Sequence, residues 1–470
     1  MPTFFGQPRA LANLFGVELW ERFSFYGMQG ILLIYLYYQS SRGGLGIDEA
    51  TATSIVGAYG GFVYLSTIAG AWLADRAIGG ERVLFGSAVL VMAGHILLAV
   101  VPGLPGVGLG LVCVALGSGG VKANATAIVG ALYDEHDPRR DAGFSLFYLG
   151  VNLGALAGPL LTGLLQTSAG FHYGFALAAL GMAIGLVQYT LGRHRLPAQA
   201  NVVPHPLPRS RVALVAALAL ASMAVIGILG RRHLAVVVVV LSAAAALAYF
   251  AVILSSPAVG RVERDRVLAF IPLFVASAGF WSLYQQQFTV LTVYADQRLN
   301  RSLFGWQMPV SWVQSINPVF IIVLSGVFAA LWTRLGERQP STPVKFAAGT
   351  VLMGVAFLLF LPMSGTGRGG APLAGLAGVI LVFTVAELLL SPVGLSLSTK
   401  LAPAAFHTQM VALFFLSVAL GTAAAGALAT RYDPAHEVPY FSILGGAAIA
   451  LGAAIAALTP AIRRLMHGVR

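Results

Sequence analysis

The sequence predicts an all-α protein that crosses a membrane many times, and its composition is the first observation that predicts this. Of the 470 residues, 58% are hydrophobic and only 10% are charged. A typical soluble domain carries about 25% charged residues, so this chain has too few charges to solvate the surface of a soluble protein of its size. The mean hydropathy of +0.83 gives the same indication. The composition argues against a soluble enzyme, a nucleic-acid-binding protein and a disordered scaffold.

Apolar runs of about 20 residues, the length that a helix needs to cross a bilayer, are the second observation. Strict alternation of polar and apolar residues is absent, so a β-barrel is not expected. Reading along the chain gives fourteen candidate helices. They are expected near residues 13–39, 51–75, 83–101, 107–130, 144–165, 174–192, 211–230, 234–255, 267–295, 308–333, 344–363, 373–400, 408–429 and 439–460.

The distribution of Lys and Arg between the spans is the third observation. Alternate loops are rich in these residues, for example at 193–211, 261–266 and 334–345, whereas the loops between them hold few. Basic residues stay on the cytoplasmic side of a membrane, which predicts that both termini are cytoplasmic. Arg231 and Arg232 are exceptions, because they fall in a loop that this orientation puts outside. The net charge of +11 is thus explained without nucleic acid.

A polar, Pro-rich segment at 193–211 divides the chain, and two spans without any charge follow it. We therefore predict an N-terminal six-helix bundle at 1–192, a cytoplasmic linker with an inserted transmembrane hairpin at 193–266, and a C-terminal six-helix bundle at 267–470. Two repeated bundles with a binding site between them are typical of transporters. The residues Gly150, Gly154 and Gly158, spaced by four, predict a helix face for close packing.

Five charged residues lie inside predicted spans and away from their ends, where a charge costs from about 3 to more than 10 kcal/mol. They are Glu18, Glu21, Arg22, Lys122 and Glu387. The first three share one helix face, which must point into a bundle or a wet cavity, with Lys122 as an expected additional partner. Such a cluster can exchange a proton for an anionic group, or it can be only a structural ion-pair network. Glu387 could bind a substrate amine, carry a proton or hold two helices together.

Motifs for other chemistry do not occur. There is no nucleotide-binding glycine loop, no zinc-ligand spacing and no G-x-S-x-G turn, and the single Cys113 permits no disulfide. We therefore expect no enzyme and no cofactor, with a proton gradient as the energy source. Rings of like charge that would predict a channel are not seen either.

Several stretches resemble the proton-dependent oligopeptide transporters of the major facilitator superfamily. ELWERFSFYGM at 18–28 resembles the first family signature, and FYLGVNLGALAGPLL at 147–161 resembles the second. GAWLADRAIGGERV at 70–83 is similar to the cytoplasmic loop motif of the superfamily. GSGGVKANATAIVG, QSINPVFII and AELLLSPVGLSLSTKLAP resemble functional stretches of later helices. The resemblance implies a fold of two six-helix bundles, with the two additional helices that similar bacterial members carry.

The resemblance also implies roles for single residues in proton-coupled symport of di- and tripeptides across the cytoplasmic membrane. The peptide carboxylate would bind Arg22, Tyr26 and Lys122. The peptide amine would bind Asn152, Asn317 and Glu387. Tyr64 would line the cavity, and Glu18 and Glu21 with Arg22 and Lys122 would couple protons. The expected partners are the peptide, protons and the lipid bilayer, with no nucleic acid and no obligate protein partner.

The chain departs from the family pattern at two substrate-site positions. Gln29 stands where many members have Arg, and Gln285 stands where they have Glu. Phe25 and Phe414 replace a Tyr and a Trp. These changes leave open an altered proton stoichiometry. They also leave open a substrate that is another small anion or zwitterion, such as nitrate, an amino acid or a metabolite.

Overall fold

The computed structural model describes residues 3–134, 137, 139–208, 210–213, 217 and 233–469 of the chain. Long helices make up most of these residues, and a two-stranded hairpin of β1 (Ser302–Leu303) and β2 (Trp306–Gln307) accompanies them. The helices are α1 (Arg9–Tyr37), α2 (Glu49–Leu73), α3 (Gly80–Val100), α4 (Gly103–Gly130), α5 (Arg140–Ala169), α6 (Phe171–Gly192), α8 (Leu234–Ser255), α9 (Arg261–Tyr284), α10 (Val290–Gln297), α11 (Ile316–Leu335), α12 (Thr342–Leu358), α13 (Leu373–Lys400), α14 (His407–Ala429) and α15 (Glu437–Leu465).

Within the described residues, twelve helical segments are long and apolar enough to cross a membrane. The all-α membrane fold expected from composition is therefore confirmed. Fourteen spans were predicted from the sequence, and two of them are not among these twelve segments. One is α1, which has 29 residues and is more polar because it carries the charged cluster at 18–22. The other is the expected span at 211–230, most of which lies outside the described residues.

The contacts between Cα atoms divide the chain into two compact units. Unit 1 comprises Met1–Ala52, Phe62–Leu234 and Pro309–Pro318. Unit 2 comprises Thr53–Gly61, Ala235–Met308 and Val319–Arg470, and it includes α8. The domain boundaries at 192/193 and 266/267 stay a prediction.

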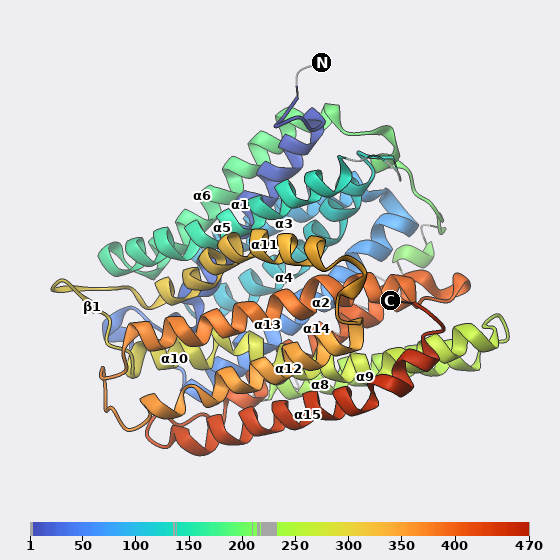
Figure 1. Ribbon diagram of the computed structural model, residues 1–470. Coiled ribbons are helices and arrows are strands. Elements are labelled where there is room, and N and C mark those ends of the chain that lie inside the picture. The colour runs from blue at the N-terminus through green and yellow to red at the C-terminus, as the bar shows by residue number, and fades with distance from the viewer. Residues whose placement is uncertain are drawn as a thin grey trace. The chain divides into compact units, whose positions relative to one another are not determined.

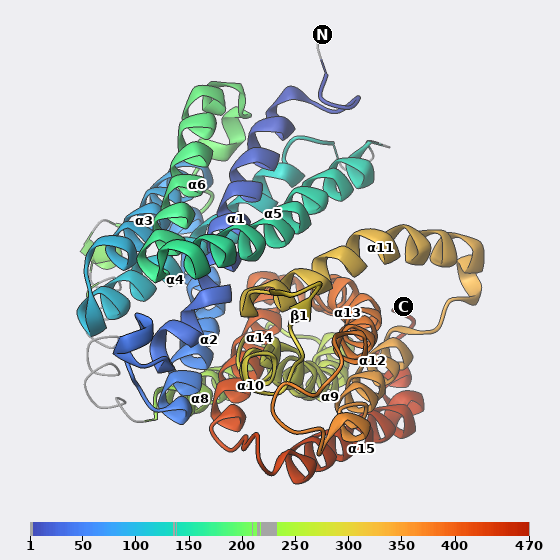
Figure 2. The same ribbon diagram turned by 90° about the vertical axis from the view of Figure 1, so that its left-hand side faces the viewer.

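In unit 1, α1 packs along α5 and α6, while α3 packs along α4 and α6 (Figures 1 and 2). The packing buries a hydrophobic core that includes Leu14 of α1, Leu84 of α3, Val121 of α4 and Tyr189 of α6. Because α1 contacts helices on two sides, most of its residues are buried, including its charged ones. This position satisfies the expectation that its charged face points away from lipid.

The glycine face of α5 explains how closely α1 and α5 approach. A Cβ atom added at Gly154 would come within 2.8 Å of the Phe23 backbone nitrogen and 2.9 Å of the Arg22 Cβ. At Gly158 it would lie 2.9 Å from the Gly27 nitrogen. Small residues allow two helix backbones to approach in a membrane, so these glycines set the depth at which Arg22 sits against α5.

In unit 2, α9 packs against α14 and α15, and α12 packs against α13 and α15. Phenylalanine rings pack between α12, α13 and α15. The rings of Phe360 and Phe441 stack with centroids 4.3 Å apart, and those of Phe357 and Phe383 stack at 5.8 Å. Aromatic pairs of this kind bury a large area, so they fix the position of α13, which carries Glu387.

We expect Gly154→Ile to destabilise the protein, because the new side chain must push α5 away from α1. Overpacking of this kind costs about 1–3 kcal/mol. The matched control is Gly378→Ile on α13, where an added Cβ would meet no atom within 4 Å. Thermal unfolding in detergent should show a melting temperature several degrees lower for Gly154→Ile than for the control. Equal melting temperatures would contradict the close contact between α1 and α5.

Candidate functional site

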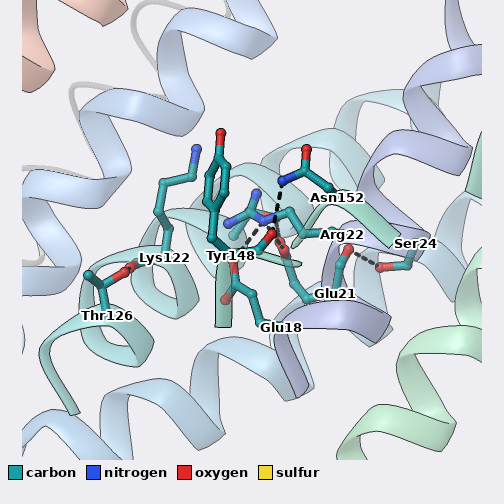
Figure 3. Close-up of polar contacts among 9 residues, drawn as sticks. Glu18, Glu21, Arg22, Ser24, Lys122, Thr126, Tyr148 and Asn152 are labelled. Atoms are coloured by element: carbon teal, nitrogen blue, oxygen red, sulfur yellow. Dashed lines mark hydrogen bonds and ion pairs between the residues drawn. The ribbon is translucent and has the colours of Figure 1, made fainter. Parts of the chain in front are cut away.

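Two carboxylates and one guanidinium form a compact buried cluster on α1. The Arg22 Nε atom lies 2.8 Å from Glu18 Oε1 and 3.2 Å from Glu21 Oε2. These three residues are at most 3% exposed. The spacing of three and four residues along one helix brings the side chains together, as the sequence predicts. Figure 3 shows the cluster with the neighbouring side chains of α4 and α5.

The cluster keeps unused hydrogen-bonding capacity. Within the described part of the chain, Glu18 Oε2 and Arg22 Nη1 have no hydrogen-bond partner. Two carboxylates also carry one more negative charge than the single guanidinium can balance. A buried group without a partner is costly, so a proton bound at the carboxylates would gain a favourable contact, and Arg22 Nη1 could donate to an acceptor.

Ser118 of α4 supplies a contact that the sequence analysis missed. Its hydroxyl donates a hydrogen bond of 2.5 Å to Glu21 Oε1, and Ser118 is completely buried. Ser24 also contacts Glu21, but its hydroxyl donates to the backbone carbonyl at 2.9 Å. Small hydroxyl residues are frequent in membrane helices, so the sequence offers no signal that singles out Ser118.

Lys122 lies one turn after Ser118 on α4 and is half-buried. Its Nζ atom lies 4.3 Å from the centre of the Tyr64 ring, a cation–π contact. Among the described residues it makes no ion pair, although it is close enough to interact electrostatically with Glu21 and Arg22. Lys122 was expected as an additional partner of the cluster, and this role stays a prediction; in this arrangement its ammonium group contacts the Tyr64 ring, while Ser118 donates the hydrogen bond to Glu21.

Two further predicted residues belong to the helices that carry or contact this cluster: Tyr26 is on α1, and Asn152 is on α5, which packs against α1. Asn152 of α5 is 5% exposed, and its Nδ2 atom donates to the Tyr148 carbonyl at 2.9 Å. Tyr26 is half-buried on α1, with its ring 5.2 Å from that of Phe25. Figure 3 shows Asn152 on the same stretch of α5 that faces Arg22.

The predicted site residue Glu387 lies in unit 2 on α13 and is 8% exposed. The Tyr284 hydroxyl of α9 donates to Glu387 Oε2 at 2.7 Å. This tyrosine was also missed, although it stands directly before the predicted Gln285. The helix α13 continues without interruption through Pro392, so the break that this proline could cause is not observed.

Besides Asn152, three other amide residues of the predicted site are buried. Gln29 of α1 is 4% exposed and Asn317, at the start of α11, is 6% exposed, and both belong to unit 1. Gln285 follows α9 in unit 2 and is 7% exposed. Its neighbour Gln286 is fully buried and accepts a hydrogen bond of 2.8 Å from the Tyr440 hydroxyl. Unit 1 therefore holds the cationic residues of the predicted site together with Glu18 and Glu21, and unit 2 holds Glu387, the carboxylate predicted to bind the peptide amine.

Comparisons with known proteins relate the chain to one family. A family model described as the POT family matches residues 81–445. The "Uncharacterized transporter YclF" of Bacillus subtilis (strain 168) is 41% identical over 475 residues, covering 99% of this chain and 96% of the relative. A "Di-/tripeptide transporter" of Lactococcus lactis subsp. cremoris is 37% identical over 489 residues, covering 100% and 98%. A mutant of the peptide transporter POT, solved in complex with alafosfalin, is 43% identical with a TM-score of 0.94, covering 99% of this chain and 97% of that one.

We expect Ser118→Ala to destabilise the protein by about 1–3 kcal/mol, because it leaves the buried Glu21 carboxylate without its donor. The cost should shrink when Glu21→Gln is already present, since an uncharged amide needs the serine less. Thermal unfolding of the two single variants and the double variant measures this coupling. Ser24→Ala is the matched control, because the Ser24 hydroxyl bonds the Glu21 backbone carbonyl and Met182 Sδ rather than the carboxylate, so its cost should not depend on Glu21→Gln. A Ser118→Ala cost that is the same in both backgrounds would show that the hydroxyl does not act on the carboxylate.

Proposed function

The chain belongs to the POT family, and from this premise we propose that it carries di- and tripeptides across a membrane by symport with protons. The observation that carries the proposal is the buried cluster of Glu18, Glu21 and Arg22, with Lys122 nearby. A zwitterionic peptide needs a cationic site for its carboxylate and an anionic site for its amine. The chain buries residues of both kinds within its predicted spans.

Arg22 and Lys122 bind the peptide carboxylate in this proposal. Arg22 Nη1 has no hydrogen-bond partner within the described residues, so it can donate to an incoming carboxylate oxygen. Lys122 forms no ion pair there, and a lysine held over an aromatic ring keeps its charge available. Tyr26 and Tyr64 line the same part of unit 1. A peptide carboxylate therefore meets an ammonium group without an ion pair in the described part of the chain and a guanidinium with an unused donor, and protonation of Glu18 or Glu21 would reduce the competing negative charge.

Glu387 binds the peptide amine, with Asn152 and Asn317 as hydrogen-bonding partners. The Tyr284 hydroxyl donates to Oε2 of Glu387 and so orients the carboxylate. Binding by main-chain amine and carboxylate is shared by all peptides, so such a site tolerates many side chains. It disfavours a simple anion such as nitrate, which Glu387 would repel.

Proton coupling is assigned to Glu18 and Glu21 together with Arg22 and Lys122. When a carboxylate of the cluster takes up a proton, the cations are released to bind the peptide carboxylate. When the peptide leaves, the cations again attract the carboxylate and favour loss of the proton. Coupling of this kind needs no cofactor beyond the proton gradient and no partner beyond the peptide and the bilayer.

The amides Gln29 and Gln285 set this chain apart from family members that carry Arg and Glu there. Neither amide titrates, so an interaction between them would not change with pH. We therefore infer that one proton-sensitive step of such members is missing, which lowers the number of protons moved for each peptide. The main proton site is then the cluster on α1, with Glu387 as a second candidate.

The distribution of Lys and Arg supports an orientation with both termini in the cytoplasm. The N-terminal end of α1 and the C-terminal end of α6 then lie on the cytoplasmic side of unit 1. The relevant bilayer is the cell membrane, across which a proton gradient drives uptake.

We expect proteoliposomes containing the protein to concentrate labelled dialanine when the outside is more acidic than the lumen. Lys122→Gln should abolish this accumulation, because it removes a cation from both the substrate site and the coupling cluster. Lys345→Gln is the matched control, since Lys345 also lies over an aromatic ring, that of Trp332, but far from the cluster in sequence. Accumulation by Lys122→Gln equal to that of the parent would remove Lys122 from the mechanism.

The role of Glu387 predicts a preference for peptides with a free amine. N-acetyl-dialanine should compete for uptake at least tenfold less well than dialanine, because a neutral amide cannot replace the ammonium group opposite a buried carboxylate. Glu387→Gln should reduce this difference by weakening dialanine alone. If both peptides compete equally against the parent protein, Glu387 does not bind the amine and has a structural role.

A further inference from the structure

A lateral groove of about 930 Å³ lies between α1 and α6 of unit 1, apart from the residues assigned to peptide and protons. It is lined by one end of each helix. The lining residues are Arg9, Ala12, Asn13, Phe15, Gly16, Leu19, Trp20, Leu180, Ala183, Ile184, Val187, Gln188, Leu191, Gly192 and Arg195. The wall is therefore mostly apolar, with an arginine from each helix at one end.

The α6 side of the groove is a continuous apolar stripe. Leu180, Ile184, Val187 and Leu191 follow one another at helical spacing and are 42–72% exposed. At 1.5 Å per residue, the stretch from Leu180 to the end of α6 rises about 18 Å. One leaflet of a bilayer has a hydrocarbon depth of about 15 Å. The groove thus has the length of a single acyl chain and does not need to span the whole membrane.

Glycines let the larger lining side chains pack closely between α1 and α6. Gly185 of α6 lies against Trp20, where an added Cβ would meet the Trp20 Cβ at 2.6 Å. Gly16 of α1 leaves space for the Gln188 side chain, whose Nε2 donates to Asn13 Oδ1 at 2.8 Å. Among the described residues, nothing donates to Gln188 Oε1, so this buried oxygen can accept a hydrogen bond from a bound molecule.

The two arginines give the groove a positive end. Arg9 begins α1 and Arg195 follows α6, and both are exposed. Within the described residues, neither forms an ion pair, and the lining contains no acidic residue. The neighbouring Arg193 differs, because its Nη2 lies 2.8 Å from Glu81 Oε2 and its guanidinium lies over the Phe85 ring. Two unneutralised cations at the basic-rich end of an apolar groove match a phosphate attached to an acyl chain.

We propose that this groove binds an anionic phospholipid, with the headgroup phosphate at Arg9 and Arg195 and one acyl chain along the α6 stripe. The orientation proposed above puts the arginines at the cytoplasmic surface, where anionic lipids attract basic residues. A peptide fits poorly, because the wall offers no acidic group for its amine. The site is separate from the peptide site, so its test does not depend on the proposed substrate.

The direct test is lipid retention by the full-length protein, purified from nanodiscs of phosphatidylglycerol and phosphatidylcholine in equal amounts. Native mass spectrometry counts the lipids that stay bound. The parent should retain phosphatidylglycerol in preference to phosphatidylcholine. Arg9→Gln with Arg195→Gln should weaken this retention about 25-fold, taking about fivefold for each charge. The matched control, Arg463→Gln with Arg464→Gln, removes two exposed arginines from the end of α15.

A second pair of variants tests the apolar part of the groove. Ala183→Trp fills the groove and should lower retention of phosphatidylglycerol, whereas Ala453→Trp on the exposed face of α15 should leave it unchanged. The proposal is overturned if the parent retains both lipids equally. It is also overturned if the two double arginine variants lose retention to the same extent, because binding would then reflect surface charge alone. An unchanged result for Ala183→Trp would likewise overturn it.

Discussion

The packing of unit 1 depends on the need to bury two carboxylates and a guanidinium on α1. Each of these charges would cost several kcal/mol if it faced lipid, so α1 has to lie inside a bundle. The glycine face of α5 and the packing of α6 provide that enclosure. The ion pairs of Arg22 and the hydroxyl of Ser118 satisfy most, but not all, of the hydrogen-bonding groups. We propose that the atoms left without a hydrogen-bond partner are where the cluster binds a proton or a peptide carboxylate.

Much of the fold could be predicted from the sequence because a bilayer leaves few choices. Backbone groups in hydrocarbon must bond within a helix, so long apolar runs become helices. The cluster at 18–22 was predictable for a similar reason, since residues three and four positions apart on one helix must meet. The close-packing role of the α5 glycines likewise followed from their spacing. Most of the expected span at 211–230 falls outside the described residues, so its prediction remains open.

Contacts between different helices were harder to predict. Ser118 and Tyr284 hydrogen-bond the two most important carboxylates, yet nothing in their local sequence distinguishes them from other hydroxyl residues. Lys122 was expected beside the cluster, but its contact with the Tyr64 ring was not anticipated. A choice among the rotamers of a lysine depends on the rings and donors of neighbouring helices. That choice is set by tertiary packing and leaves no periodic signal in the chain.

The central claim is that peptide movement through this protein is coupled to proton movement. Vesicles containing the protein and a trapped pH-sensitive dye, with equal pH inside and outside and the membrane potential clamped at zero, test this most directly. Addition of dialanine outside should acidify the lumen, because each entering peptide brings protons with it. An equal amount of N-acetyl-dialanine should give a much smaller change. Entry of labelled dialanine with no acidification of the lumen would contradict the account, since it would show uniport.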